Sequence, residues 1–355
     1  MKVLLLGEFS ALHKNLKEGL DALGHEAVIA STGDGWKNVP RDIDLDSRFP
    51  SFVGKVHRRI KPLLLINEME GFDVVQLMNP FIFFKKIFKY DYFFEKIISN
   101  NGQFFMLGAG DDAYFWRHGK KVLEYGPFED FLKYDSKTKS YFMETDKAYK
   151  FNASLVSRAK GIIPIMYEYE VSYSSASNRL ATIPMPVNTD KIKYIPNKVG
   201  KKLVVFHGLN RYGAKGTHYV EEAFRVLAER YPNDLELIID GTMPLNEYLE
   251  VMARTNVVLD QVNSYSCGMN AIYALAMGKV VLGGAEPESL ASLGVEQSPV
   301  VNVKPNAKSI IEQIELLLKN RDEFESLGCQ ARKFAQDVHG HIKVAQTYVD
   351  AWNGA

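Results

Sequence analysis

The chain has 355 residues with 43 basic and 43 acidic side chains, so its formal net charge is zero. Balanced charge removes the electrostatic basis for binding nucleic acid, and we expect no such partner. The two cysteines, Cys267 and Cys329, cannot build a disulfide framework or a CxxC metal site, which fits a reducing, cytoplasmic setting. No apolar run is long enough for a membrane span or a signal peptide, and this length favours two domains.

The first half of the sequence alternates apolar runs with amphipathic stretches. Leucines recur at helical spacing between Leu12 and Leu23, and Gly24 follows at a position where helix ends favour glycine. The apolar runs predict buried strands at residues 2–6, 26–30, 72–77 and 103–107, and the resulting βαβ order predicts a parallel sheet. No G-x-G-x-x-G follows the first strand, so the dinucleotide-binding fingerprint is absent.

Three aspartates, Asp42, Asp44 and Asp46, lie in an irregular polar stretch. An Asp-x-Asp pair can hold a divalent metal on a nucleotide diphosphate, because hard cations prefer carboxylate oxygens. Short acidic runs are more often exposed to solvent, and no strong strand precedes this one. We therefore favour an acidic surface loop and expect no metal site.

Residues 80–96, PFIFFKKIFKYDYFFEK, mix aromatic side chains with lysines. One interpretation is a patch that touches a membrane surface. The other is a crossover helix whose aromatic face lies in the core. We favour the core helix, because Asp91 can start a separate helix and so interrupts the amphipathic stripe.

Asp111 and Asp112 follow the strand expected at residues 103–107. Ligands of open α/β sheets bind at the carboxyl ends of the strands, so either carboxylate could face a binding site. Either could equally well cap the N-terminus of a following helix. Both interpretations stay open for this pair.

A cluster of prolines between residues 183 and 197 separates two halves of similar pattern. Such clusters are typical of domain boundaries. Beyond it, strands at residues 202–206, 235–239, 257–259 and 279–282 alternate with helices at 217–230, 245–254 and 269–277. The sequence thus predicts an α/β fold with two domains, residues 1–184 with a C-terminal helix at 340–355, and residues 185–339.

Residues 256–284 are predicted to form a strand, a loop with one glycine, a short Ala-rich helix and a second strand. A loop that runs directly into a helix presents unpaired N–H groups at the positive end of the helix dipole. This arrangement can bind a phosphate. An ordinary βαβ unit with nothing bound is about as probable, because such units are common.

Two halves of this kind, with a proline-marked joint and a terminal helix, resemble the GT-B fold of nucleotide-sugar glycosyltransferases, in which two Rossmann-like domains with parallel sheets face a cleft. The loop HGLNRYGAKG at residues 207–216 resembles the donor loop of that family. The resemblance implies that Arg211 and Lys215 hold the donor diphosphate and that Gly216 lets the chain turn into the next helix. It also places His207 and Gly208 among the donor-binding residues.

The stretch after residue 256 resembles the retaining, family-four-like members, which carry two glutamates separated by seven residues. Those two positions fall on Tyr265 and Tyr273 here. A tyrosine hydroxyl can hydrogen-bond a sugar or ribose, but it is not a carboxylate at neutral pH. The resemblance still implies donor contacts in the loop and at the start of the helix, from Ser266, Gly268, Met269 and Asn270. In the loop after the next strand it points to Glu286 or Glu288 as a contact to donor or acceptor, and we name Glu286; a glutamate exposed to solvent is an equally good interpretation of this loop.

The resemblance implies an enzyme that moves a sugar from a nucleotide-diphosphate sugar to a glycan or lipid-linked acceptor, with retention of configuration and without a metal or other cofactor. Asp111, Lys215 and Arg211 are the expected catalytic residues, with Asp111 near the acceptor. We keep open a non-catalytic relative that binds sugar nucleotides or glycans, and a sugar-nucleotide epimerase of the same fold. Polysaccharide assembly in the cytoplasm, with or without peripheral contact at the inner face of a membrane, fits this picture.

Overall fold

The structure is a computed structural model that describes residues 1–82, 90–241 and 245–355. The chain forms two compact units. Unit 1 contains Met1–Gly119, Phe142–Asn188 and His341–Ala355, and unit 2 contains Lys120–Tyr141 and Thr189–Gly340. In the described residues, no helix combines the length and the apolar character needed to cross a bilayer.

Unit 1 is built on a six-stranded, wholly parallel sheet in the order β3-β2-β1-β4-β5-β6. In chain order, the strands are β1 (Lys2–Leu6), β2 (Glu26–Ser31), β3 (Ile43–Asp44), β4 (Val74–Leu77), β5 (Gln103–Gly108) and β6 (Gly161–Pro164). Val3 to Leu6 are fully buried, as expected for a central parallel strand covered by helices on both faces. The helices are α1 (Leu12–Ala22), α2 (Ser51–Leu64), α3 (Tyr90–Ser99), α6 (Asp146–Val156), α7 (Tyr167–Ser172) and α15 (His341–Gly354).

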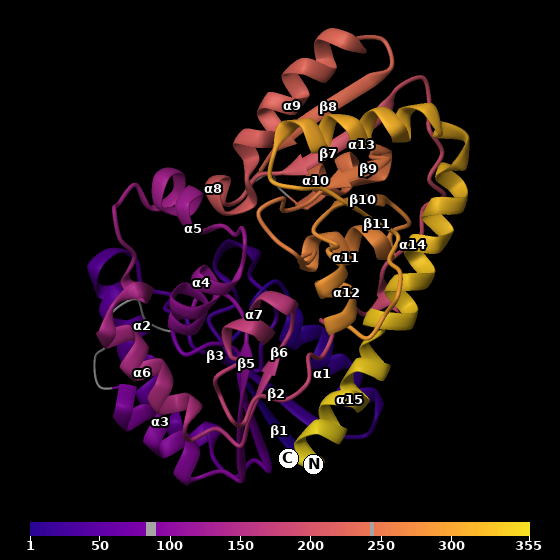
Figure 1. Cartoon of the computed structure of the whole chain (residues 1–355). Coiled ribbons are helices and arrows are strands. Elements are labelled where there is room, and N and C mark those ends of the chain that lie inside the picture. The colour runs from indigo at the N-terminus through magenta and orange to yellow at the C-terminus, as the bar shows by residue number, and fades with distance from the viewer. Residues whose placement is uncertain (83–89, 242–244) are drawn as a thin grey trace. The chain divides into compact units, whose positions relative to one another are not determined.

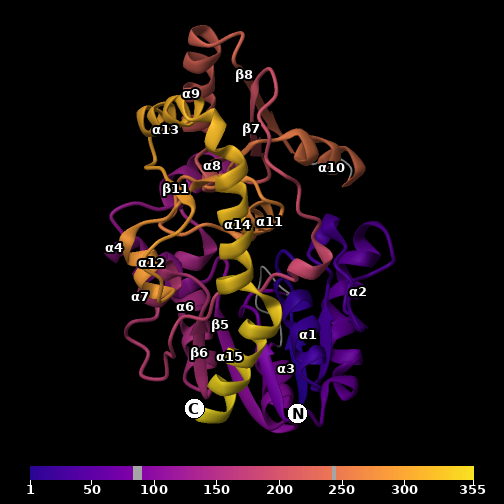
Figure 2. The same cartoon turned by 90° about the vertical axis from the view of Figure 1, so that its right-hand side faces the viewer.

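The C-terminal helix α15 belongs to unit 1 and packs beside α1 (Figures 1 and 2). Gly19 of α1 makes this close approach possible, because a side chain there would collide with the carbonyl of His341. At the far end of α15, Trp352 Nε1 donates to Gln76 Oε1 at 3.2 Å. The predicted terminal helix is therefore fixed both by close helix packing and by a buried hydrogen bond to a central strand.

Unit 2 is built on a five-stranded parallel sheet in the order β11-β10-β9-β7-β8. The strands are β7 (Leu203–Gly208), β8 (Leu235–Asp240), β9 (Val257–Leu259), β10 (Val280–Gly283) and β11 (Val300–Asn302). The helices that follow them are α8 (Tyr212–Lys215), α9 (Thr217–Arg230), α10 (Leu245–Arg254), α11 (Met269–Ala276), α12 (Pro287–Ser292), α13 (Ala307–Lys319) and α14 (Phe324–His339). Figure 2 shows α14 crossing in front of α11, where Gly328 lies against the backbone of Gly278.

The segment Lys120–Tyr141, which we call the strap, packs with unit 2 although it lies between β5 and β6 of unit 1 in sequence. It carries the short helices α4 (Lys120–Val122) and α5 (Phe128–Asp130), labelled in Figure 1, and a further helical turn at Phe131–Ser136. The sequence pattern had placed it in the N-terminal domain, but the structure groups it with unit 2, because it makes contacts with residues more than 70 positions further along the chain. The other boundaries fall at 188/189 and 340/341.

The structure bears on two interpretations of segments in unit 1. Phe93 and Phe94 of α3 are buried in the core, which confirms the core helix for that part of residues 80–96; residues 83–89 lie outside the described residues. In the acidic loop, Asp44 pairs with Arg41 and Lys61, and Asp46 pairs with Arg58. The described residues contain no cluster of His, Cys, Asp or Glu that could hold a metal ion.

Candidate functional site

Asp260 lies directly after β9 and connects two of the predicted site residues. Its carboxylate is buried, with Oδ1 at 3.5 Å from Lys215 Nζ and Oδ2 accepting the backbone N–H of Gly268 at 2.9 Å. Lys215 comes from the loop after β7, and Gly268 from the loop that leads into α11. The two predicted elements of a phosphate site therefore meet on one side chain at the carboxyl ends of neighbouring parallel strands.

Lys215 is held in place by the loop that carries it. Its ammonium group donates to the carbonyl of Gly208 at 3.0 Å, and only 9% of the residue is exposed. Gly216, which follows α8, has a φ of +70°, and a Cβ there would lie 2.5 Å from Val262 Cγ2. Only glycine satisfies both conditions without strain, so the loop fixes where the lysine stem begins.

His207 is buried at the end of β7, and the chain uses both ring nitrogens. Nδ1 lies 2.9 Å from the carbonyl oxygen of Leu259, and Nε2 lies 2.9 Å from Thr217 Oγ1 at the start of α9. Burial lowers the pKa of His207 to about 4, so the ring is neutral. The structure does not support His207 as a direct donor contact. Its two hydrogen bonds indicate a structural role, because they connect the end of β7 to β9 and to the start of α9.

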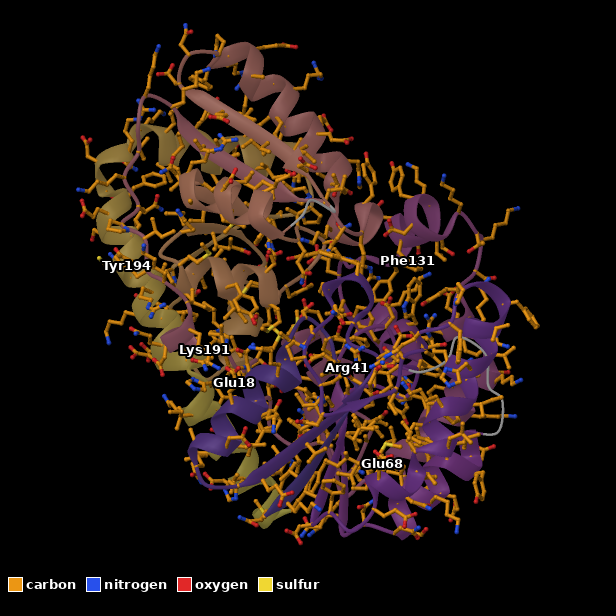
Figure 3. All side chains as sticks on the ribbon, turned by 180° about the vertical axis from the view of Figure 1, so that it is seen from behind. Glu18, Arg41, Glu68, Phe131, Lys191 and Tyr194 are labelled. Atoms are coloured by element: carbon orange, nitrogen blue, oxygen red, sulfur yellow. The ribbon has the colours of Figure 1, made fainter. Side chains whose placement is uncertain are left out.

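Arg211 precedes α8 and is exposed. Its guanidinium carbon lies 5.4 Å from the centre of the Phe131 ring, a cation–π contact with the strap. Figure 3 labels Phe131 at this place on the strap. Arg211 and Lys215 are therefore one exposed and one buried cation at the two ends of the same short helix.

The start of α11 offers fewer free N–H groups than the sequence predicted, because the Gly268 N–H is bound to Asp260. Met269 and Asn270 are the first two residues of the helix, so their N–H groups have no acceptor within it. The Oδ1 atom of Asn270 accepts from the Tyr248 hydroxyl at 3.1 Å. Its buried Nδ2 group has no hydrogen-bond partner in the part of the chain that is described.

Tyr265 and Tyr273 occupy the positions of the two family glutamates. Tyr265 is buried and stacks on Tyr125 of the strap, with ring centres 4.5 Å apart and planes 16° apart. Its hydroxyl accepts the backbone N–H of Glu124 at 3.2 Å, and burial raises its pKa. Tyr273 is half-buried on α11, three residues after Asn270. Ser266, in the same loop as Tyr265, is buried and accepts from the Ser289 hydroxyl at 2.7 Å.

Glu286 lies beside Tyr265, since its backbone N–H donates to the Tyr265 carbonyl at 3.0 Å. Its carboxylate accepts from the Tyr125 hydroxyl at 2.6 Å, Asn302 Nδ2 at 2.9 Å and Lys304 Nζ at 2.7 Å. Burial works to raise the pKa of Glu286, but the hydrogen bonds from these groups outweigh it and hold the pKa below its ordinary value. A buried carboxylate thus lies next to the position where the family glutamate is missing.

The strap contacts each of the three loops that form this site. Besides the contact of Tyr125 with Tyr265 and Glu286, Asp130 Oδ2 accepts from Asn263 Nδ2 at 2.8 Å. The Asp135 carboxylate accepts the N–H groups of Gly213 and Ala214 at 3.0 and 2.8 Å. An aspartate therefore occupies the backbone N–H groups at the start of α8, so these groups are not available to a ligand.

In unit 1, buried acids also lie at the carboxyl ends of strands. Asp112 follows β5, accepts from the Phe115 N–H at 2.8 Å and the Tyr173 hydroxyl at 2.6 Å, and its pKa is raised by burial to about 7. It is the residue of the pair that caps a helical turn. Asp111 is half-buried and lies 3.4 Å from Trp116 Nε1. Glu8, after β1, accepts the N–H groups of His13 and Lys14, and burial raises its pKa to about 8.

Solved structures share this fold along the whole chain. HepE of Anabaena in complex with UDP and glucose matches with a TM-score of 0.65 and 12% identity, and both chains are covered completely. Sucrose-phosphate synthase from Thermosynechococcus elongatus matches with 0.63 and 14%, again over both full chains. UDP-GlcNAc 2-epimerase from Neisseria meningitidis, bound to UDP-GlcNAc, matches with 0.53 and 14% over both full chains. No protein-family model and no curated sequence matches.

These likenesses confirm the predicted fold class: the chain is an α/β protein with the GT-B fold of two Rossmann-like units. Sequence reasoning missed two parts of the site, Asp260 and the strap. Asp260 had a usable signal, because an acid directly after a buried strand is expected at the binding edge of a parallel sheet. The strap had none, since its pattern is irregular and its contacts are distant in sequence.

Proposed function

We propose that the chain is a glycosyltransferase that moves a sugar from a nucleoside-diphosphate sugar to a hydroxyl of a glycan or lipid-linked acceptor. One observation carries the proposal: Lys215 and the loop that starts α11 meet on Asp260 at the carboxyl ends of β7 and β9. The neighbours with UDP or a UDP-sugar bound make uridine diphosphate the first nucleotide to test.

The donor diphosphate lies against Lys215, Arg211 and the N–H groups of Met269 and Asn270. Departure of the sugar leaves negative charge on the diphosphate, and fixed cations and N–H groups stabilise that charge. Asp260 is a positioning residue here, because it holds the ammonium group of Lys215 beside the loop that starts α11. With these groups in place the reaction needs no metal ion.

Tyr265 and Tyr273 contact the donor through their hydroxyls, in place of the two glutamates of the retaining enzymes. Glu286 supplies the nearby carboxylate and keeps it ionised through Lys304. Retention of configuration follows from the resemblance to that family. In unit 1, Asp111 at the end of β5 is the residue we assign to the acceptor, because it is the half-buried member of its pair.

Turnover of UDP-, GDP- and ADP-glucose, measured as nucleotide release with and without a glycan acceptor, tests the proposal. We expect Lys215→Met and Arg211→Ala each to lower kcat/KM by about 10²- to 10³-fold. Arg225→Ala, at an exposed position on α9, is the control and leaves turnover unchanged. If both site variants turn over like the wild type, the diphosphate assignment is wrong. Arg211 is exposed, so its loss does not threaten folding.

A sugar-nucleotide epimerase is the second candidate. It shares the diphosphate site but needs ionisable groups for proton transfer, and Glu8 and Asp112 are buried acids with raised pKa values at strand ends of unit 1. Conversion of a UDP-sugar in the absence of any acceptor favours the epimerase. Binding of a UDP-sugar with neither transfer nor conversion favours the non-catalytic relative.

A further inference from the structure

Helix α2 of unit 1 exposes a row of large apolar side chains. Phe52, Val53, Val56, Ile60 and Leu64 are between 37% and 77% exposed, and Phe49 just before the helix is 54% exposed. Scattered exposed apolar residues are common, but a contiguous group of this kind marks an interaction surface. Figure 2 shows α2 on the outside of unit 1.

The spacing places these residues on one face of the helix. Phe52, Val56, Ile60 and Leu64 recur at every fourth residue, and four residues advance an α-helix by about 40° beyond a full turn. The four side chains therefore spread over roughly 120° of the helix surface. This width matches the apolar face of an amphipathic helix, but here that face is turned toward solvent.

Unit 1 holds the other side of α2 through polar groups, through the buried residues Gly54 and Pro62, and through Leu63, which packs against the core. Lys61 pairs with Asp44 at 3.4 Å and donates to the Asp46 carbonyl at 2.6 Å. His57 Nδ1 lies 2.9 Å from Ser47 Oγ, and Gly54 is buried. A helix that served only the core would turn its apolar face inward, so the exposed face needs another explanation.

Basic residues flank the apolar face. The helix contains Lys55, Arg58, Arg59 and Lys61 and no acid. Lys55, Arg59 and the preceding Arg48 are exposed, and none of them makes an ion pair or hydrogen bond with the described part of the chain. Exposed apolar side chains beside unpaired cations are the combination that binds an anionic lipid surface.

We propose that α2 docks unit 1 onto an anionic phospholipid bilayer. The helix lies parallel to the surface, with Phe52, Val56, Ile60 and Leu64 below the headgroups and Lys55 and Arg59 against the lipid phosphates. A second copy of the chain is less suited to cover this apolar face, because a symmetric contact would bring the cations of both copies together. The proposal stands independently of the proposed sugar transfer, since lipid binding is measured without turnover.

The test is sedimentation of the full chain with vesicles of phosphatidylcholine alone or mixed with phosphatidylglycerol. We expect binding to the mixed vesicles that weakens as salt is raised. Phe52→Ser/Ile60→Ser/Leu64→Ser lowers the partition coefficient roughly tenfold or more, and so does Lys55→Glu/Arg59→Glu. Leu316→Ser and Lys308→Glu, on exposed positions of α13 in unit 2, are the matched controls and bind like the wild type.

All substituted side chains are exposed, so circular dichroism should find every variant folded like the wild type. Three results would overturn the proposal. The first is a wild type that does not sediment with the mixed vesicles, and the second is a triple variant that sediments as well as the wild type. The third is a wild type that does not bind vesicles but forms a dimer that the triple variant abolishes, because the apolar face then belongs to a second copy.

Discussion

Both units place buried acids at the carboxyl ends of parallel strands, but the groups that face those acids differ. In unit 1, burial raises the pKa of Glu8 to about 8 and that of Asp112 to about 7. In unit 2, Asp260 faces the ammonium group of Lys215, and Glu286 faces that of Lys304 and has a lowered pKa. At the same position in the same kind of sheet, the pKa of a carboxyl group is thus raised where burial dominates, as in Glu8 and Asp112, and lowered where a cation and hydrogen bonds outweigh burial, as in Glu286.

The difference bears on which ligand each unit suits. In unit 2, Lys215 faces Asp260 and comes from the segment that would receive a diphosphate, so a negative ligand would enter a site that already contains paired charges. In unit 1 the carboxyl groups are satisfied by backbone N–H groups and a tyrosine hydroxyl. Both carboxyl groups are buried, so they favour an uncharged ligand only indirectly, by adding no full negative charge to the strand ends while they are protonated.

The largest effect that would test this contrast is expected for Glu8→Gln. The folded pKa of Glu8, about 8, lies above its ordinary value of 4.5, so the stabilisation is complete below pH 4.5 and is lost as the pH rises through 8. A tenfold change in proton affinity is worth about 1.4 kcal/mol. Between pH 4 and pH 9, the free energy of unfolding of the variant relative to the wild type should therefore rise by on the order of 4 kcal/mol.

Urea unfolding across this pH range measures the difference. The wild type should lose stability between pH 4.5 and 8. The variant should lose less, because only Asp112, with a pKa of about 7, still contributes to the loss. Equal pH profiles for the two proteins would show that the pKa of Glu8 is not raised in the folded state. Unit 1 would then not differ from unit 2 in the way described above.

Asp260→Asn tests the side of unit 2. Among the described residues, the substitution leaves the Gly208 carbonyl as the partner of the buried ammonium group of Lys215. Breaking a buried ion pair in this way costs about 3 kcal/mol. Urea unfolding at pH 7 measures the loss. In the double variant with Lys215→Met, the two losses should not add, because neither charge is left alone. Additive losses would mean that the two side chains do not interact.

The strands and the loop with Lys215 could be predicted from the sequence, because each is determined by residues that are close together in the chain. Buried parallel strands such as β1, β7 and β9 are short apolar runs bounded by turns, and the loop with Lys215 and Gly216 carries its own glycine signal. Nothing local predicts the charge state of Glu8, since it depends on burial by residues from other elements. The strap could not be predicted for the same reason: Tyr125 meets Glu286, 161 positions away.

Asp135→Ala should have a smaller effect on unit 2. The N–H groups of Gly213 and Ala214 lose their acceptor, but the side chain is only half-buried, so water can take its place. We expect a loss of about 1.5 kcal/mol in the free energy of unfolding. Hydrogen exchange at these two amides should accelerate, and Asp135→Asn, which keeps one acceptor oxygen, should restore part of the protection. If the exchange rates of these two amides do not change, Asp135 of the strap does not protect the start of α8.

Tyr125→Phe should have the smallest effect. It removes the hydroxyl that donates to Glu286 at 2.6 Å and keeps the ring that stacks on Tyr265. Because Glu286 retains Asn302 and Lys304, we expect a loss of about 1 kcal/mol in urea unfolding. Tyr125→Ala removes the stacking as well and should cost more. If the two variants were equally stable, the stacking of Tyr125 on Tyr265 would not contribute to the binding of the strap to the rest of unit 2.

The central claim is that a diphosphate binds where Lys215 and the start of α11 meet on Asp260. Calorimetric titration of UDP into the wild type, Lys215→Met and the control Arg225→Met tests it most directly. We expect UDP to bind the wild type and the control equally, uridine to bind far more weakly, and Lys215→Met to lose at least about tenfold in affinity for UDP. A Lys215→Met protein that binds UDP as tightly as the wild type would contradict the account.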